Sequence, residues 1–123
     1  MWRSRSESIV SNESVVKTFV VDIYIGLKEG YDGPQHSIEE LKDALQIICD
    51  EGLCVSVIPA SYVYKGGREY GAIVKLINYP RFPSNPEAIK TKAILIANKL
   101  KDHFKQNRVS VQAPDVTYMI GDS

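Results

Sequence analysis

The sequence predicts one α+β domain in which an antiparallel sheet carries two helices on one face. The first observation is the order of the hydrophobic periods over residues 15–120, which run two, 3.6, two, two, 3.6 and two residues. The second is a pair of helix-start signals, at Ser37 and Asn85, and the third is a glycine-rich turn at residues 65–68. Together they give the order β-α-β-β-α-β of a ferredoxin-like sandwich.

The first strand is expected within residues 15–27, whose side chains alternate between two faces. One face is strongly apolar, with Phe19, Val21, Ile23 and Ile25. The other face is mixed, with Thr18, Val20, Asp22, Tyr24 and Gly26. We therefore expect the helices to pack on the apolar face. Residues 28–36 follow as a loop that contains two glycines and a proline.

The first helix is expected to begin at Ser37, because Glu40 stands three residues later and completes a capping box. Gly52 is the expected stop. Between them runs an apolar stripe at helical spacing, formed by Ile38, Leu41, Leu45 and Ile48.

Residues 53–64 and 70–79 predict two strands joined by the turn at residues 65–68. Pro59 cannot donate a ladder hydrogen bond, so its strand must be an edge, a bulge or a break. Asn85 caps the second helix and Pro86 takes its first position; the helix should end near Asn107. Residues 108–120 predict a last strand, which Pro114 interrupts.

Length and composition set the remaining bounds. The chain has 123 residues, 15 basic and 15 acidic, which fits one domain at residues 15–123 behind a flexible arm at residues 1–14. The net charge of zero argues against binding to duplex nucleic acid. Cys49 and Cys54 have no partners at metal-ligand spacing, so we expect buried thiols, no metal and no cofactor. No apolar run is long enough to span a membrane, and a cytoplasmic location is expected.

The second sheet face is too apolar for water alone. Val20, Asp22 and Tyr24 lie on it, and the middle strands are expected to add Ser56, Ile58, Ile73, Lys75, Ile77 and Tyr79. Exposed apolar patches of a few hundred Å² usually mark an interface or a binding groove. We therefore expect the protein to form a homo-oligomer through this face.

The turn between the middle strands is the best local candidate for ligand binding. Its glycines expose backbone N–H groups, its two cations attract an anion, and its two tyrosines offer flat surfaces. The residues are Tyr64, Lys65, Gly66, Gly67, Arg68 and Tyr70. The spacing of a phosphate-binding Walker loop is absent. The alternative is a turn with no ligand.

Arg81 and Phe82 form a second candidate, because they stand between two prolines just before a helix N-terminus. Arg81 could hold a phosphate while Phe82 stacks on a base. Secondary candidates are His36, as an acid or base, and Asp22 with Tyr24. Lys75 is the expected partner of Asp22, as a structural ion pair rather than as part of an acid–base dyad.

The stretch Phe19-Val20-Val21-Asp22-Ile23-Tyr24-Ile25-Gly26-Leu27, the capped helix at residues 37–52 and the strand start at residues 53–57 resemble small dimeric α+β barrel proteins and ferredoxin-like signalling proteins. Short bacterial and phage proteins of this build are known. The resemblance is architectural and carries over no catalytic residue. It implies subunits joined through their sheets, with ligands in clefts between subunits.

Three functions are open at this point. The leading hypothesis is a non-enzymatic oligomeric module that senses or sequesters a small anionic, nucleotide-like ligand, because no nucleophile or metal set is recognisable. The ligand is expected in clefts between subunits, built from the Gly66–Gly67 turn and the Arg81–Phe82 loop. The first alternative is a small cofactor-independent enzyme of the dimeric α+β barrel type. The second is an adaptor that binds another protein.

Overall fold

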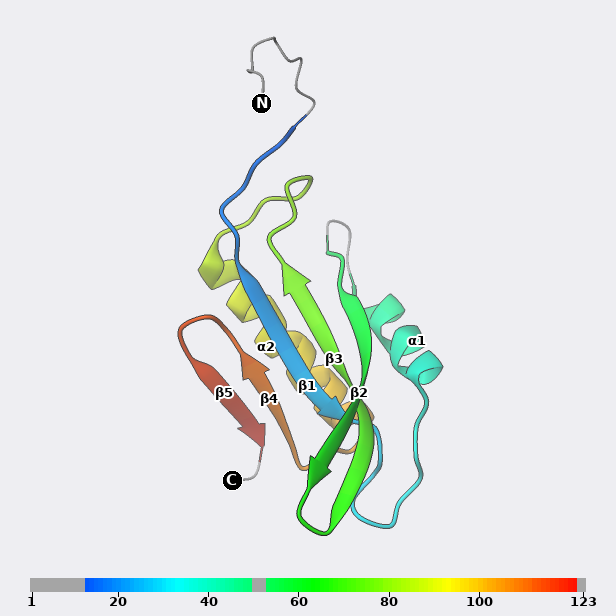
Figure 1. Cartoon of the computed structure of the whole chain (residues 1–123). Coiled ribbons are helices and arrows are strands. Elements are labelled where there is room, and N and C mark those ends of the chain that lie inside the picture. Colours follow the sequence, from blue (N-terminus) through cyan, green and yellow to red (C-terminus); the bar gives the residue numbers. More distant parts are fainter. Residues whose placement is uncertain (1–12, 50–52, 122–123) are drawn as a thin grey trace, which may run out of the picture.

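The computed structural model describes residues 13–49 and 53–121, and these form a five-stranded antiparallel sheet with two helices (Figure 1). The strands are β1 (Val20–Gly26), β2 (Ser56–Tyr64), β3 (Gly67–Ile77), β4 (Arg108–Gln112) and β5 (Thr117–Gly121). The helices are α1 (Ile38–Ile48) and α2 (Pro86–His103). The sheet order is β2-β3-β1-β4-β5, so the predicted α+β class is confirmed.

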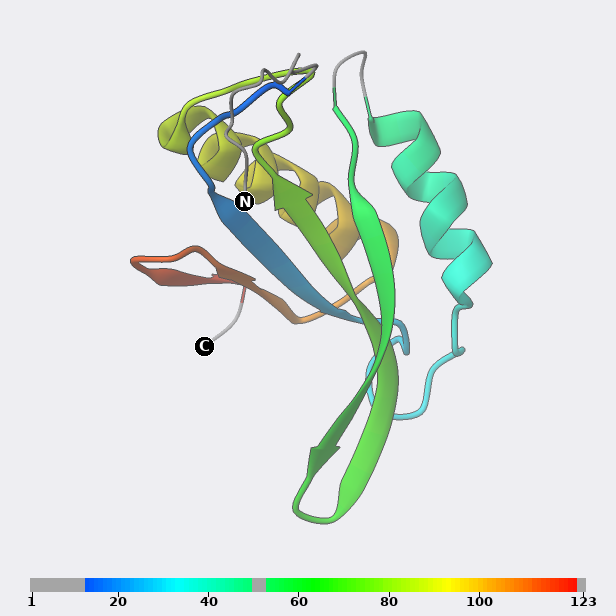
Figure 2. The same cartoon turned by 45° about the horizontal axis from the view of Figure 1, so that its top comes forward.

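The core lies between the sheet and the helices, as the alternation in β1 predicts. Val21, Ile23 and Ile25 are fully buried. Figure 2 shows α2 crossing the sheet behind β1 and β3, while α1 runs beside β2. Both helices bury residues in this one core, including Leu41 of α1 and Leu100 of α2. The opposite face, here called the open face, carries no helix.

Both helices begin where the sequence predicts. The Ser37 hydroxyl accepts the Glu40 backbone N–H at 3.1 Å, and the Glu40 carboxylate accepts the Ser37 N–H at 2.9 Å. The side chain of Asn85 accepts the Ala88 N–H at 2.8 Å. The helix ends differ from expectation: α1 ends at Ile48 and α2 at His103. Gly52, the predicted stop of the first helix, lies outside the described residues.

The last predicted strand is two strands. The Ala113 N–H donates to the Val116 carbonyl at 2.9 Å across a turn that contains Pro114, so β4 and β5 form a hairpin. Pro59 lies in β2, which is an outer strand, as its missing donor requires. Cys54 is exposed and Cys49 is only partly buried, so the expectation of two buried thiols is wrong.

The register places the expected strand residues on the open face, but Tyr79 lies beyond the end of β3 and is not placed by it. Asp22 pairs with Lys75, Val20 with Ile77, and Ser56 with Lys75 from the other side. Ile58 is 39% exposed on this face. Within the described residues, neither helix is long and apolar enough to cross a membrane. The predicted arm lies outside the described residues, apart from positions 13 and 14.

Candidate functional site

Two hollows lie at opposite ends of β1. We call one the loop pocket, because the loop between β3 and α2 covers it, and the other the Gly26 pocket, after the last residue of β1. β1 has seven residues, so the two pockets are roughly 20 Å apart.

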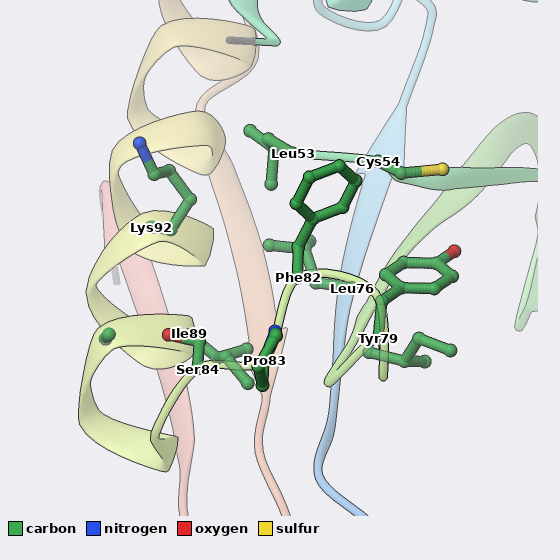
Figure 3. A pocket seen from close by; sticks show the side chains of 11 residues that line it. Leu53, Cys54, Leu76, Tyr79, Phe82, Pro83, Ser84, Ile89 and Lys92 are labelled. Carbon is green, nitrogen blue, oxygen red and sulfur yellow. The ribbon is translucent and has the colours of Figure 1, made fainter. Parts of the chain in front are cut away.

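The loop pocket is the better formed hollow, with a volume of about 380 Å³ (Figure 3). The Phe82 ring projects into its centre, and Lys92 approaches from α2. The loop is held by the Phe82 N–H, which donates to the Tyr79 carbonyl at 3.0 Å. The lining is mainly apolar and consists of Leu53, Cys54, Leu76, Ile77, Tyr79, Phe82, Pro83, Ser84, Ala88, Ile89 and Lys92.

The described lining of the loop pocket contains few polar groups. Among the described residues, one charged side chain, Lys92, belongs to it. Hydrogen bonding to Cys54 raises the pKa of the Tyr79 phenol, so Tyr79 adds no negative charge near neutral pH. Arg81 does not line the pocket; its guanidinium carbon lies 5.6 Å from the centre of the Phe82 ring. Arg81 therefore stacks on Phe82, and its predicted role as an anion clamp stays a prediction.

The Gly26 pocket is smaller, about 170 Å³, and more polar. It lies at the end of the open face where β1 meets the loop that follows it. Its lining brings together segments far apart in the sequence and consists of Gly26, Lys28, Gly30, Tyr31, Glu69, Gln106, Asn107 and Arg108. Both signs of charge are therefore present within one hollow.

Tyr62 and two strand glycines shape the sheet beside this pocket. The Tyr62 hydroxyl donates to the carbonyls of Ile25 and Ala72, at 3.1 and 2.7 Å. The ring can lie flat across the sheet because Gly71 has no Cβ, which would stand 2.5 Å from the Tyr62 ring. Burial raises the pKa of Tyr62 to about 12, and the charge of Glu69 adds to the rise.

The predicted turn lies at the same end of the sheet as the Gly26 pocket but does not line it. Lys65 and Gly66 form the tip, Gly66 has φ +88°, and Gly67 already belongs to β3. Tyr64 and Tyr70 are 52% and 64% exposed. Arg68, paired with Val63, points to the face opposite Glu69. The expected cleft between this turn and the Arg81–Phe82 loop does not form within one subunit, because the full length of β3 separates them (Figure 1).

The secondary candidates are placed as follows. Lys75 Nζ lies 2.9 Å from Asp22 Oδ1 on the open face, which is the expected ion pair. The Tyr24 hydroxyl donates to Gln112 Oε1 at 2.7 Å. His36 lies between the carboxylates of Glu29 and Glu40, which orient its ring. The sequence did not reveal these two partners.

Sequence reasoning also missed Glu69 of β3 and the pair Gln106 and Arg108, which lies far from Glu69 in the sequence. A signal was present in the two strand glycines, Gly26 and Gly71, because glycine inside a strand marks a close approach of other groups.

Comparison with known proteins gives two matches in fold. No protein-family model matches the chain, and no curated protein matches it. A solved structure of a phage SAM lyase in the apo state is 25% identical, with a TM-score of 0.67, over 85% of this chain and 90% of that one. A phage SAM lyase in complex with S-methyl-5'-thioadenosine is 23% identical, with a TM-score of 0.69, over 93% of this chain and 97% of that one.

These matches correct the leading functional hypothesis. The chain shares its fold, over most of its length, with an enzyme, which contradicts a non-enzymatic binding module and favours the alternative of a small enzyme. The absence of a recognisable nucleophile or metal motif in the sequence was therefore not a sound argument against an enzyme. The resemblance to small α+β proteins of phages is confirmed at the level of the fold.

Proposed function

We propose that this protein is a lyase that cleaves S-adenosylmethionine and releases S-methyl-5'-thioadenosine. The observation that carries this proposal is the match, along 93% of this chain, to a SAM lyase that holds S-methyl-5'-thioadenosine. The apo enzyme matches over a similar length at 25% identity.

The two compounds define the bond that breaks. S-methyl-5'-thioadenosine keeps the sulfur, the methyl group and the adenosyl group, so the bond lost is the one from sulfur to the γ-carbon of the amino-acid chain. Its electron pair returns to the sulfonium, which becomes a neutral thioether. In one route the substrate's own carboxylate oxygen attacks the γ-carbon and homoserine lactone forms. In the other, a base removes a β-proton and 2-aminobut-3-enoate forms.

We favour the cyclisation, because it needs no protein nucleophile, no water and no proton transfer. The substrate carries a net charge of one, the lactone leaves with a protonated amine, and the thioether is neutral, so charge and atoms balance. The protein then acts by folding the chain so that the carboxylate lies behind the γ-carbon, and well-oriented intramolecular reactions gain many orders of magnitude from such placement.

We propose that the reaction takes place at the open-face end of the sheet. The substrate carries a carboxylate as well as two positive charges, so its binding calls for protein groups of both signs. The Gly26 pocket offers the Glu69 carboxylate beside two cations. We also propose that copies of the chain associate through the open face, which would enclose this shallow end.

The test is a direct assay of the purified protein with S-adenosylmethionine in ¹⁸O-labelled water, followed by mass spectrometry at short times. We expect S-methyl-5'-thioadenosine and unlabelled homoserine lactone in equal amounts. Label in the hydroxyl of homoserine would show hydrolysis, and 2-aminobut-3-enoate would show elimination. Because the cyclisation can occur unaided, buffer and heat-unfolded protein are the controls. A rate less than about a hundredfold above both would contradict the proposal.

A further inference from the structure

The Gly26 pocket contains two acceptor oxygens that converge on one point. A Cβ built on Gly26 would collide with the Glu69 carboxylate and would stand 2.9 Å from Gln106 Oε1. The Glu69 carboxylate therefore occupies the space that the missing side chain leaves, and Gln106 Oε1 borders it. Glycine at position 26 lets these two acceptors approach the backbone of β1.

Gln106 is fixed with its oxygen toward this space. Its Nε2 donates to the Lys28 carbonyl at 2.9 Å and to the Phe104 carbonyl at 3.0 Å. Both donor hydrogens of the amide are thus used by backbone carbonyls, and Oε1 is left to accept. These two hydrogen bonds fix the orientation of the Gln106 amide.

Glu69 has unused acceptor capacity. Among the described residues, no hydrogen bond or ion pair joins its carboxylate to another group. It is only partly exposed, and Tyr62, its cross-strand neighbour, already donates its hydroxyl hydrogen to backbone carbonyls. A partly buried carboxylate without a donor is costly, and a cationic ligand would satisfy it.

Cations lie on the other side of the same pocket. Lys28 and Arg108 belong to its lining. The β1–β4 register pairs Asp22 with Gln112 and Tyr24 with Ser110. Continuing this register places Arg108 opposite Gly26, on the open face. The pocket thus presents acceptors over Gly26 and positive charge beside them.

We infer that the Gly26 pocket binds the amino-acid end of the substrate, that is, an α-ammonium and its carboxylate. Glu69 and Gln106 Oε1 accept hydrogen bonds from the ammonium, and Arg108 with Lys28 holds the carboxylate. A volume of about 170 Å³ suits such an end and not a whole nucleoside. This inference rests on the proposed function for the identity of the ligand, and it makes Glu69 a determinant of specificity.

The test is calorimetric binding of two probes that are not turned over. S-adenosylhomocysteine has the amino-acid end, and S-methyl-5'-thioadenosine lacks it. For Glu69→Gln we expect S-adenosylhomocysteine to bind about tenfold or more weakly, since a hydrogen bond to a charged group is lost. S-methyl-5'-thioadenosine should change by less than about twofold. Gln106→Leu should act in the same direction, and Asp43→Asn, exposed on α1, is the matched control.

Equal weakening of both probes by Glu69→Gln, or no weakening of either, would overturn the inference, as would wild-type protein that binds neither probe. The turnover assay separates it from the proposed function. An active Glu69→Gln enzyme with an unchanged KM would contradict the inference about the Gly26 pocket and support the proposed lyase activity. Selective binding of S-adenosylhomocysteine by a protein that does not turn over S-adenosylmethionine would support the inference and contradict the lyase activity.

Discussion

His36 Nε2 lies 2.6 Å from Glu29 Oε2, so an imidazole ties the loop after β1 to the start of α1. Its other nitrogen, Nδ1, lies 2.8 Å from Glu40 Oε2, and Glu40 also closes the capping box of α1. The ring packs edge-on against Phe104, with 5.2 Å between ring centres. Protonation of His36 therefore affects its contacts with the loop after β1, with the capping box of α1 and with Phe104 in the core.

His36 predicts a pH dependence of stability. Hydrogen bonds to Glu40 and Glu29 raise its pKa above 6.5, so the native state favours the protonated ring. The stabilisation is complete below pH 6.5 and declines as the pH rises through the raised native pKa. The difference in melting temperature between wild type and His36→Gln should be larger at about pH 5.5 than at about pH 9.

The control for this prediction is His103→Gln. His103 also packs edge-on against Phe104, at 4.7 Å, but no carboxylate contact joins it to the described residues. It should leave the pH profile nearly unchanged. A wild-type advantage over His36→Gln that stays constant from about pH 5.5 to 9 would contradict the assignment.

Tyr62→Phe should destabilise the sheet by about 1 kcal/mol, because it removes a hydroxyl that donates to carbonyls of β1 and β3. Since the native pKa is about 12, the tyrosine contribution is complete below pH 10 and is lost as the pH rises toward 12. Urea unfolding measures the first effect, and phenolate absorbance during alkaline titration measures the second. Tyr64→Phe, on the same strand and 52% exposed, is the control. Equal unfolding free energies for the two variants would count against this role.

The Asp22–Lys75 ion pair should contribute little to stability. The two side chains are 20% and 33% exposed, and pairs open to water are worth about 0–1 kcal/mol. A double-mutant cycle with Asp22→Asn and Lys75→Met, followed by urea unfolding, should give a coupling energy in that range. A coupling above about 2 kcal/mol would show that the open face is covered in solution and the pair desolvated.

Self-association through the open face predicts that single charges there separate the subunits. Ile58 and Ile73 face each other across β2 and β3 on this face. Ile58→Lys and Ile73→Lys should shift sedimentation toward the single chain. Ile47→Lys is the control, because Ile47 is 85% exposed on α1. If the wild-type protein sediments as single chains at roughly 0.1 mM, self-association through the open face is contradicted.

The sequence predicted those parts of the fold that depend on local patterns. The alternation in β1 identified its buried face, and the capping signals at Ser37 and Asn85 located both helix starts. Glycine 66 and its neighbours marked the hairpin. These features follow from backbone and side-chain preferences within a few residues, so they can be read without tertiary information.

The site could not be predicted in the same way. Glu69 lies far in the sequence from Gln106 and Arg108, and only the folded sheet with the turn before β4 brings them around Gly26. The hairpin of β4 and β5 was read as a single strand because both halves alternate and only the turn at Pro114 separates them. The leading functional hypothesis was wrong because it rested on the absence of a nucleophile or metal motif, whereas the fold matches that of an enzyme.

Pro59 limits one way in which copies of this protein could associate. It lies in β2, the outermost strand beside β3, where it pairs with Ala72. A neighbouring chain that extended the sheet along β2 would find one amide missing from the ladder. Growth of the sheet into open-ended fibres is thereby discouraged on this side, whereas the proposed contact through the open face needs no hydrogen bond from this edge.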